Sequence, residues 1–296
     1  MQSGRGMPHS LGSLCAISSA FFLGLNTSLA RLAYEGGANA GSVAFLRILG
    51  SILVVSLFVV ISRRSIDFPR IALWPIFGVG IAIVLQGSSY LSSVSYIPVG
   101  LAVLLFYTYP LMVALASSIF EKEKIEFGRK IALIAAFFGI SLAIGPSFTV
   151  LDWRGIILAL IGAFGVMMIF IFTGQALKHT SATVVSLYSN LLALPLMAII
   201  MIYFFDGYQQ PYTISGMNSL LCVCSLYGIA ILMQFAAIHS IGKTLTALLS
   251  NVEPLVSISA GVILLNETLT GIQYVGGVTV VTSLVISDYL AKQKMR

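Results

Sequence analysis

The sequence predicts an all-α integral membrane protein with ten transmembrane helices, arranged as two inverted five-helix repeats. Three observations lead to this fold class: an apolar composition, ten apolar runs of spanning length, and an internal duplication. Hydrophobic residues make up 58% of the 296-residue chain and charged residues 9%. Because soluble domains carry roughly 25% charged residues, this chain lacks the polar surface that water requires. A lipid bilayer is therefore its expected solvent.

Ten runs are long and apolar enough to cross a bilayer, since a spanning helix needs roughly 20 apolar residues. They cover about 11–32, 40–62, 71–91, 97–119, 127–146, 153–175, 183–205, 216–238, 243–265 and 270–290. The alternating pattern of a membrane β-barrel is missing from these runs. The first run exceeds the roughly 7–15-residue apolar region of a signal peptide, so we interpret it as a membrane helix.

The chain repeats part of its own sequence. Residues 97–123 match residues 241–267 at an offset of 144, with nine identical pairs in 27 positions. Residues 80–83, Gly-Ile-Ala-Ile, recur at 228–231. The predicted repeats cover 11–146 and 153–291. Because each contains five helices, an odd number, the second must enter the membrane in the opposite direction from the first.

Basic residues predict the orientation, because lysine and arginine gather on the cytoplasmic side of membrane proteins. With the N-terminus inside, 13 of the 16 basic residues fall in cytoplasmic segments, and the exceptions are Arg31, Arg47 and Arg154. We expect both termini in the cytoplasm and the chain in the inner cell membrane. The net charge of +6 does not indicate a nucleic-acid partner, because the basic residues form no patch interleaved with aromatic ones.

Glu253 is the most unusual residue in the apolar runs. It lies near the middle of the ninth run, where a charged side chain costs about 2.5–3.5 kcal/mol on insertion scales. Thr246, Ser250 and Ser257 share its face at helical spacing. Two interpretations stay open. Glu253 is either a protonated acid that hydrogen-bonds between helices, or a cavity carboxylate that touches substrate or carries a proton.

Two prolines occupy matching positions, Pro254 in the ninth run and Pro110 in the fourth. Each removes an amide donor and is expected to leave a carbonyl free one turn earlier, at Ser250 and Phe106. Helices interrupted at matched positions mark the binding level in many duplicated membrane proteins. The alternative is a packing kink that neighbouring helices tolerate.

Arg47 lies about seven residues into the second run from the outside, roughly 10 Å deep at 1.5 Å per residue. It either extends outward to the membrane surface or points inward as an anion site. If Arg47 and Glu253 face one cavity, they offer a cationic and an anionic contact. That combination would suit a zwitterion such as an amino acid.

Further polar side chains within the runs are candidates to line such a cavity. Tyr107 and Tyr109 lie in the middle of the fourth run, and Tyr109 occupies the repeat position of Glu253. The other candidates are Asn26, Gln86, Tyr90, Asn190 and Tyr227. The alternatives are a buried tyrosine with a single hydrogen-bond partner, and amides that join helices.

The matched segments also resemble a known family. Residues 101–125, LAVLLFYTYPLMVALASSIFEKEKI, and 245–269, LTALLSNVEPLVSISAGVILLNETL, resemble the paired signatures of the drug/metabolite transporter superfamily, EamA type. The resemblance covers nearly the whole chain. It implies ten helices in two inverted repeats, a central cavity lined by helices 1–4 and 6–9, and transport of small metabolites, often amino acids and frequently outward. The residues carried over are Pro110, Pro254, Glu253, Glu123 and Glu267.

We therefore predict a secondary transporter, an exporter or exchanger, that moves a small organic metabolite by alternating access. An amino acid or related zwitterion is the expected substrate class. The sequence contains no nucleotide-binding loop, so ATP does not drive transport directly, and we predict no cofactor and no metal. A non-transporting membrane scaffold or receptor is the alternative. An intramembrane enzyme is least favoured, because the dispersed His9, His179 and His239 supply no nucleophile–base pair. A homodimer stays open as the assembly state.

Overall fold

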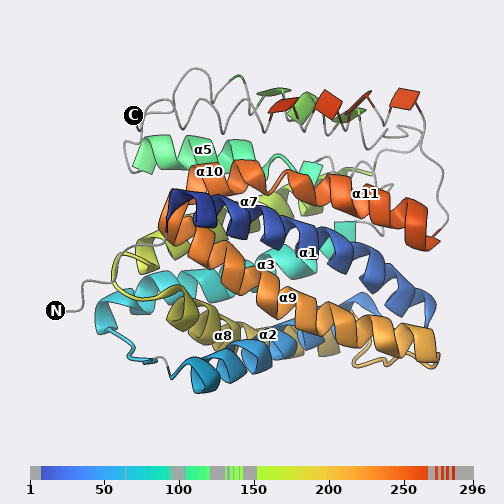
Figure 1. Cartoon of the computed structure of the whole chain (residues 1–296). Helices are drawn as coiled ribbons and strands as arrows, with labels where there is room; N and C mark the ends of the chain where they lie inside the picture. Colours follow the sequence, from blue (N-terminus) through green and yellow to red (C-terminus); the bar gives the residue numbers. More distant parts are fainter. Residues whose placement is uncertain are drawn as a thin grey trace.

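The computed structural model describes residues 8–63, 65–93, 96, 102, 105–120 and 152–265, with scattered residues in 131–142 and 271–283. Every regular element in this part of the chain is a helix (Figure 1). The elements are α1 (His9–Glu35), α2 (Ala40–Ser62), the 3-10 turn η1 (Arg70–Ala72), α3 (Leu73–Ser93), α5 (Tyr109–Phe120), α7 (Trp153–Ala176), α8 (Ala182–Phe204), α9 (Ile214–Ile241), α10 (Lys243–Leu249) and α11 (Val252–Leu265).

Six helices in the described residues are long and apolar enough to cross a membrane: α1, α2, α3 with η1, α7, α8 and α9. Their ends agree within three residues with the predicted spans 1, 2, 3, 6, 7 and 8. Large apolar side chains such as Leu57, Val60 and Ile61 cover the outer surface of α2, as expected where lipid replaces water. The chain is an integral membrane protein. The predicted spans 127–146 and 270–290 lie mostly outside the described residues.

Short polar side chains set where the helices begin. Asn39, Asp152, Ser181 and Thr213 precede α2, α7, α8 and α9, and each accepts a hydrogen bond from a backbone N–H two or three residues later. Such caps satisfy one of the free amides of the first helical turn. At the end of α9, Gly242 adopts a φ of 79°, a conformation that favours glycine. The chain therefore passes directly from α9 into α10.

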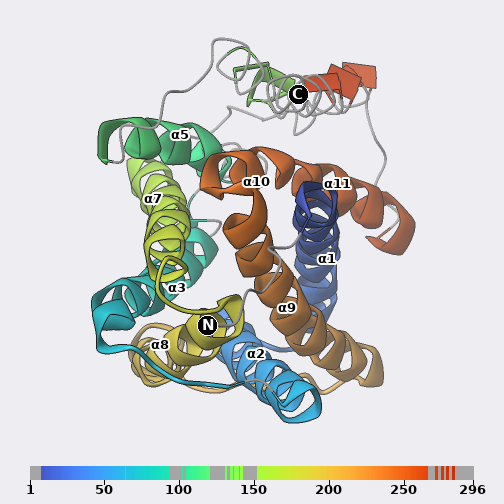
Figure 2. The same cartoon turned by 60° about the vertical axis from the view of Figure 1, so that its left-hand side comes forward.

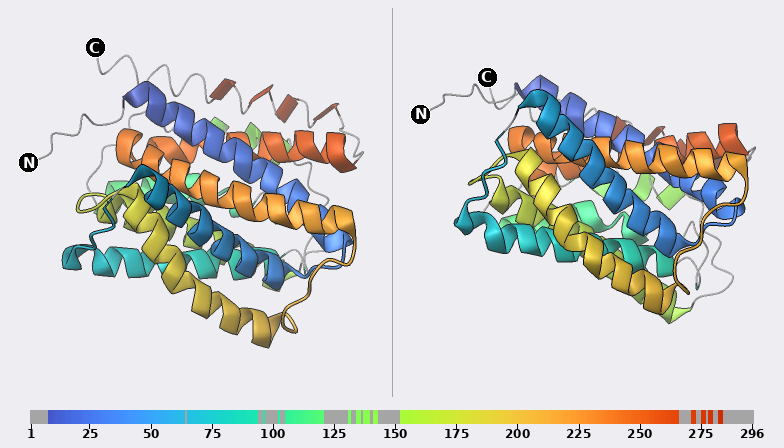
Figure 3. Two further views of the ribbon diagram at one scale, coloured as in Figure 1. Left: turned by 60° about the horizontal axis from the view of Figure 1, so that its bottom comes forward. Right: turned by 90° about the horizontal axis from the view of Figure 1, so that it is seen from below.

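The helices pack in corresponding pairs. α1 packs along α9, and α7 packs along α3 (Figures 2 and 3). In the same way α2 packs on α9 and α8 on α3, while α1 contacts α11 and α7 contacts α5. In Figure 2, α3 and α7 form one side of the bundle and α1 and α9 the other, with α2 and α8 at one end and α5, α10 and α11 at the other.

The core lies where these pairs meet. Phe170 of α7, Phe235 of α9 and Ile76 of α3 are fully buried. Small residues let the helices approach closely, since a Cβ atom added at Gly12 would lie 2.5 Å from the Ser240 hydroxyl oxygen. Tight backbone contact of this kind is how membrane helices associate without a hydrophobic driving force.

Loops at the two ends of the bundle are also joined. The Asn39 side-chain amide donates to the carbonyls of Phe205 at 2.6 Å and Gly207 at 2.9 Å, which ties the α1–α2 turn to the α8–α9 loop. At the opposite end, the Tyr188 hydroxyl donates to the Ile66 carbonyl at 3.3 Å. The α2–α3 connection is thereby held against α8.

Candidate functional site

The predicted ninth helix is broken, not merely kinked. α10 and α11 are separated by a turn at Ser250 and Asn251, so Glu253 lies in the first turn of a new helix. The Glu253 amide donates to the Ser250 carbonyl at 3.0 Å. The expectation that Pro254 leaves this carbonyl without a donor is therefore wrong, because the tight turn supplies a different amide.

The fourth predicted helix is broken at the matching place. A turn at Tyr107 and Thr108 precedes α5, and the Thr108 amide donates to the Leu105 carbonyl at 3.2 Å. Pro110 is then the second residue of α5, where a missing amide costs little because first-turn amides have no partner within the helix. The turns at 107–108 and 250–251 lie 143 positions apart, within one residue of the sequence offset. Two helix starts therefore lie at matched positions of the repeat.

Side chains from the two breaks contact each other. The Tyr107 hydroxyl lies beside the Glu253 carboxylate, and the Tyr109 hydroxyl lies beside that of Ser250, each close enough to interact. Tyr107 and Tyr109 are 5% and 2% exposed, whereas Glu253 is only half-buried. A carboxylate inside an apolar bundle thus has a phenol on one side and keeps part of its surface accessible.

Arg47 points inward. Its guanidinium carbon lies 4.6 Å from the centre of the Tyr227 ring, a cation–π contact between α2 and α9. The Arg47 Nε is buried and has no hydrogen-bond acceptor among the described residues. Of the two predicted positions for Arg47, the structure shows the inward one.

Arg47 and Glu253 face the same region without pairing. Arg47 is close enough to act electrostatically on Glu253, and both residues act on Tyr90 and Tyr227. Among the described residues, Arg31 and Glu35 form an ion pair on the surface at 3.6 Å. No ion pair within 4 Å joins Arg47 to Glu253. A cation and an anion therefore lie near each other inside the bundle, each still able to bind a partner of opposite charge.

An aromatic cluster surrounds the break at Tyr107 and Thr108. Tyr90 and Phe106 have ring centroids 4.3 Å apart, Phe106 and Tyr109 5.9 Å, Tyr107 and Tyr109 5.9 Å, and Tyr109 and Phe170 5.8 Å. Phe106 and Phe170 were not among the sequence candidates, because an apolar residue in an apolar run carries no distinguishing signal. The rings form an aromatic wall at the break that lies beside Glu253.

Four other predicted residues bind nearby backbone or pack against it. The Asn26 amide donates to the Val223 carbonyl at 2.7 Å, and the Asn190 amide donates to the Ser186 carbonyl at 2.8 Å. Thr246 donates to the Gly242 carbonyl at 2.7 Å. The backbone of Gln86 packs closely on Gly165 of α7. The side-chain carbonyl oxygens of both asparagines are buried without a donor.

Asn251 is a polar residue of the break that sequence reasoning missed. It is 2% exposed, and its side-chain oxygen has no hydrogen-bond donor. An asparagine just before a helix normally caps an amide two or three residues later. Three residues later stands Pro254, which has no amide to donate. The signal was an asparagine three residues before a proline, which together mark a helix start.

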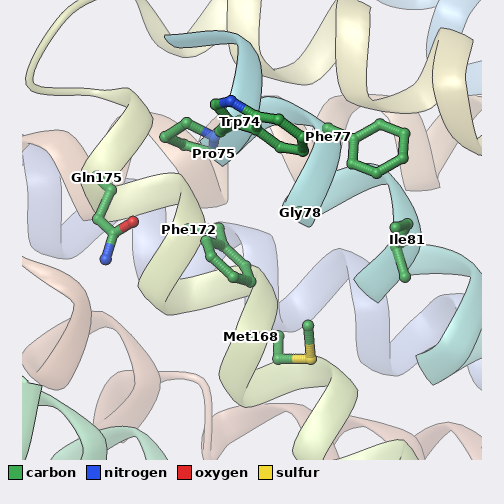
Figure 4. Close-up of a pocket in the computed structure, with 8 residues that line it drawn as sticks. All are labelled: Trp74, Pro75, Phe77, Gly78, Ile81, Met168, Phe172 and Gln175. Atoms are coloured by element: carbon green, nitrogen blue, oxygen red, sulfur yellow. The ribbon is translucent and has the colours of Figure 1, made fainter. Parts of the chain in front are cut away.

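Nothing in the described residues resembles a metal site, since no group of three His, Cys, Asp or Glu side chains lies close enough to hold an ion. A groove of about 450 Å³ lies between α3 and α7 (Figure 4). Its walls are apolar apart from Gln175, and it includes none of the predicted site residues. The groove therefore does not suit a polar solute, whereas the candidate site lies at the helix breaks.

Comparison with known proteins gives the family. The model of the EamA-like transporter family matches the chain twice, at residues 10–145 and 153–287. The chain is 28% identical over 254 residues to the threonine/homoserine exporter RhtA of Salmonella typhimurium, strains SL1344 and LT2. The match covers 83% of this chain and 80% of each relative. A solved crystal structure superposes with a TM-score of 0.79 at 18% identity, covering 97% of this chain and 99% of that one.

Proposed function

Because the chain belongs to the EamA-like transporter family, we propose that it exports a small zwitterionic solute, an amino acid or a close relative, by alternating access. One observation carries the substrate class: an inward-facing arginine and a glutamate lie within electrostatic range inside the bundle but do not pair. An α-amino acid presents a carboxylate and an ammonium a few atoms apart, so it can bind both groups at once.

The assignment of contacts follows from charge. The substrate carboxylate binds Arg47, whose planar guanidinium suits a carboxylate and whose position is fixed by Tyr227. The substrate ammonium binds Glu253, which has the Tyr107 hydroxyl beside it. The unpaired side-chain oxygen of Asn251 offers a second acceptor beside it. Buried acceptors without donors are costly, so a bound donor group would relieve that cost.

We also propose the ten-helix architecture with two inverted repeats, 11–146 and 153–291. Three observations support it. The main helix contacts made by one half have counterparts in the other, such as α1 with α9 and α7 with α3. The two helix breaks fall at matched positions. The family model matches once in each half. Cytoplasmic termini and an inner-membrane location rest on the distribution of basic residues.

Threonine and homoserine are the first substrates to test, because the relatives named above are exporters of these two amino acids. Purified protein reconstituted in vesicles should release preloaded labelled threonine or homoserine faster than vesicles without protein. Glu253→Gln should abolish this flux while the protein remains folded, because the amide cannot neutralise the ammonium. Glu35→Gln is the matched control, since Glu35 is an exposed surface carboxylate paired with Arg31.

The result distinguishes the proposal from its alternatives. If no amino acid is transported by protein that is folded and thermally stable, the chain is a scaffold or receptor and the proposal fails. If flux is present but Glu253→Gln matches the wild type at every pH, transport stands and the role of Glu253 is refuted.

A further inference from the structure

The groove between α3 and α7 suits a ligand of a different kind from the polar solute. Its walls are Trp74, Pro75, Phe77, Gly78 and Ile81 from α3, and Met168, Phe172 and Gln175 from α7 (Figure 4). Trp74 is 76% exposed, so an aromatic ring stands at the rim with most of its surface uncovered by protein. Trp74 and Phe77 form an edge-to-face pair with centroids 6.2 Å apart. The groove is an apolar slot open on the outer face of the bundle.

Two basic residues lie beside the helix ends that form this slot. Arg70 begins η1, four residues before Trp74, and Lys178 follows Gln175 by three residues after the end of α7. Both side chains are exposed. Neither forms an ion pair within 4 Å in the part of the chain that the structure describes. Gln175 is a polar residue of the groove wall.

The segments that carry these cations are held in place. The connection before η1 is fixed on α8 by the Tyr188 hydroxyl, which donates to the Ile66 carbonyl, and by ring contact between Phe68 and Tyr188 at 4.7 Å. The nearby acid, Asp67, accepts a hydrogen bond from the Ser65 hydroxyl within its own turn. The amide of Lys178 donates to the Gln175 carbonyl at 3.2 Å, which continues α7 into a tight turn.

We propose that this groove binds an anionic phospholipid, with one acyl chain between α3 and α7 and the phosphate between Arg70 and Lys178. The apolar slot and the exposed tryptophan suit the acyl chain and the interfacial region, and the two cations suit the headgroup. Basic residues beside a groove between membrane helices recognise anionic headgroups in this way. The groove joins a helix of the first half to one of the second, so the bound lipid contacts both halves.

The site is separate from the solute site. None of its wall residues touches Glu253, Tyr107 or Arg47 in a contact that the structure records, and it opens to the lipid-facing surface. Its charge is of one sign, whereas the interior site offers both signs. A zwitterionic solute therefore gains nothing from it, while an anionic lipid gains both an apolar and an ionic contact.

Tryptophan quenching tests the proposal directly, because the chain has two tryptophans and one stands on the groove. In full-length protein carrying Trp153→Phe, Trp74 is the sole reporter. The protein is reconstituted into equal mixtures of phosphatidylglycerol and phosphatidylcholine, with one lipid or the other brominated. Trp74 should be quenched more strongly by brominated phosphatidylglycerol. Arg70→Gln and Lys178→Gln should each reduce this preference by about fivefold, the contribution of one basic residue near an anionic surface.

Arg63→Gln is the control, since Arg63 is an exposed cation that caps α2, is not one of the groove residues and should leave the preference unchanged. High salt should weaken the preference in the wild type, because it screens exposed charges. Equal quenching by the two lipids would show an ordinary, unselective boundary contact and overturn the proposal. A preference that survives the combined Arg70→Gln and Lys178→Gln changes would overturn it as well, and neither result bears on amino-acid flux.

Discussion

Gly24 of α1 should be essential because it lies directly against the helix break that carries Glu253. A Cβ atom added at Gly24 would lie 2.6 Å from the Glu253 carbonyl oxygen and 2.7 Å from the Val256 Cβ. Ordinary contact begins at 3.4 Å, so α1 and α11 would have to separate by about 0.8 Å, the difference between 3.4 and 2.6. Overpacking of this kind costs about 1–3 kcal/mol.

The functional effect of Gly24→Ala follows from the same displacement. Moving the Glu253 backbone changes the distance between its carboxylate and the Tyr107 hydroxyl from the opposite half. A hydrogen bond to a charged group contributes about 1.5–3 kcal/mol. We therefore expect about a 10–150-fold loss of apparent substrate affinity, since each 1.4 kcal/mol is tenfold. The melting temperature of the purified protein and the concentration dependence of flux in vesicles measure the two effects.

Gly87→Ala is the matched control for Gly24→Ala. The same methyl group is added to a helical glycine, but nothing lies within 4 Å of the added Cβ. Because glycine within a helix is about 1 kcal/mol less favourable than alanine, this variant should be as stable as the wild type or more so, with unchanged flux. Wild-type stability and flux in Gly24→Ala would refute the reasoning, as would an equal loss in both variants.

Three further predictions concern the interior site and the loop contact. Tyr227→Leu removes the ring under Arg47, so the KM should rise about 2–30-fold, corresponding to about 0.5–2 kcal/mol, as vesicle kinetics would show. Asn251→Leu removes a buried side-chain oxygen that has no hydrogen-bond donor, so the melting temperature should be unchanged or higher. Flux should fall, because the proposed substrate contact is lost. A lower melting temperature would indicate a structural role. Asn39→Ser should destabilise less than Asn39→Ala in thermal unfolding, because serine keeps the α2 cap and loses only the bonds to the α8–α9 loop.

The six long helices were predictable and the two breaks were not, for one physical reason. Hydropathy reports how apolar a segment is over about 20 residues, and it is continuous from 243 to 265 whether the backbone turns or not. Pro254 fits both a kinked helix and the first turn of a new one. The deciding signal was local: Ser250 and Asn251 before Glu253 and Pro254 combine a capping residue, an acid and a proline, the usual signature of a helix start.

The sequence indicated candidate residues but not the contacts between them. Glu253 stood out because a charge in an apolar run is rare. Its partner Tyr107 comes from the other half of the chain, and no periodicity within either segment encodes that meeting. The direction of Arg47 was likewise open, because outward extension and inward burial fit the same sequence. In the structure, the inward-pointing Arg47 lies against the ring of Tyr227, which belongs to α9, far along the chain.

The unpaired state of the interior charges bears on how transport would be driven. If the halves rock past one another as proposed, the Tyr107–Glu253 contact between them would break and reform, and the site would pass through a state closed to water on both sides. An empty site would then hold Arg47 and Glu253 dehydrated and unpaired, which costs several kcal/mol. A bound zwitterion neutralises both groups and removes most of that cost. We therefore expect the loaded protein to reorient faster than the empty one, so labelled threonine inside vesicles should leave faster when unlabelled threonine is present outside. Efflux that is independent of external amino acid would show that Arg47 and Glu253 pair with each other, or with protons, during the return step.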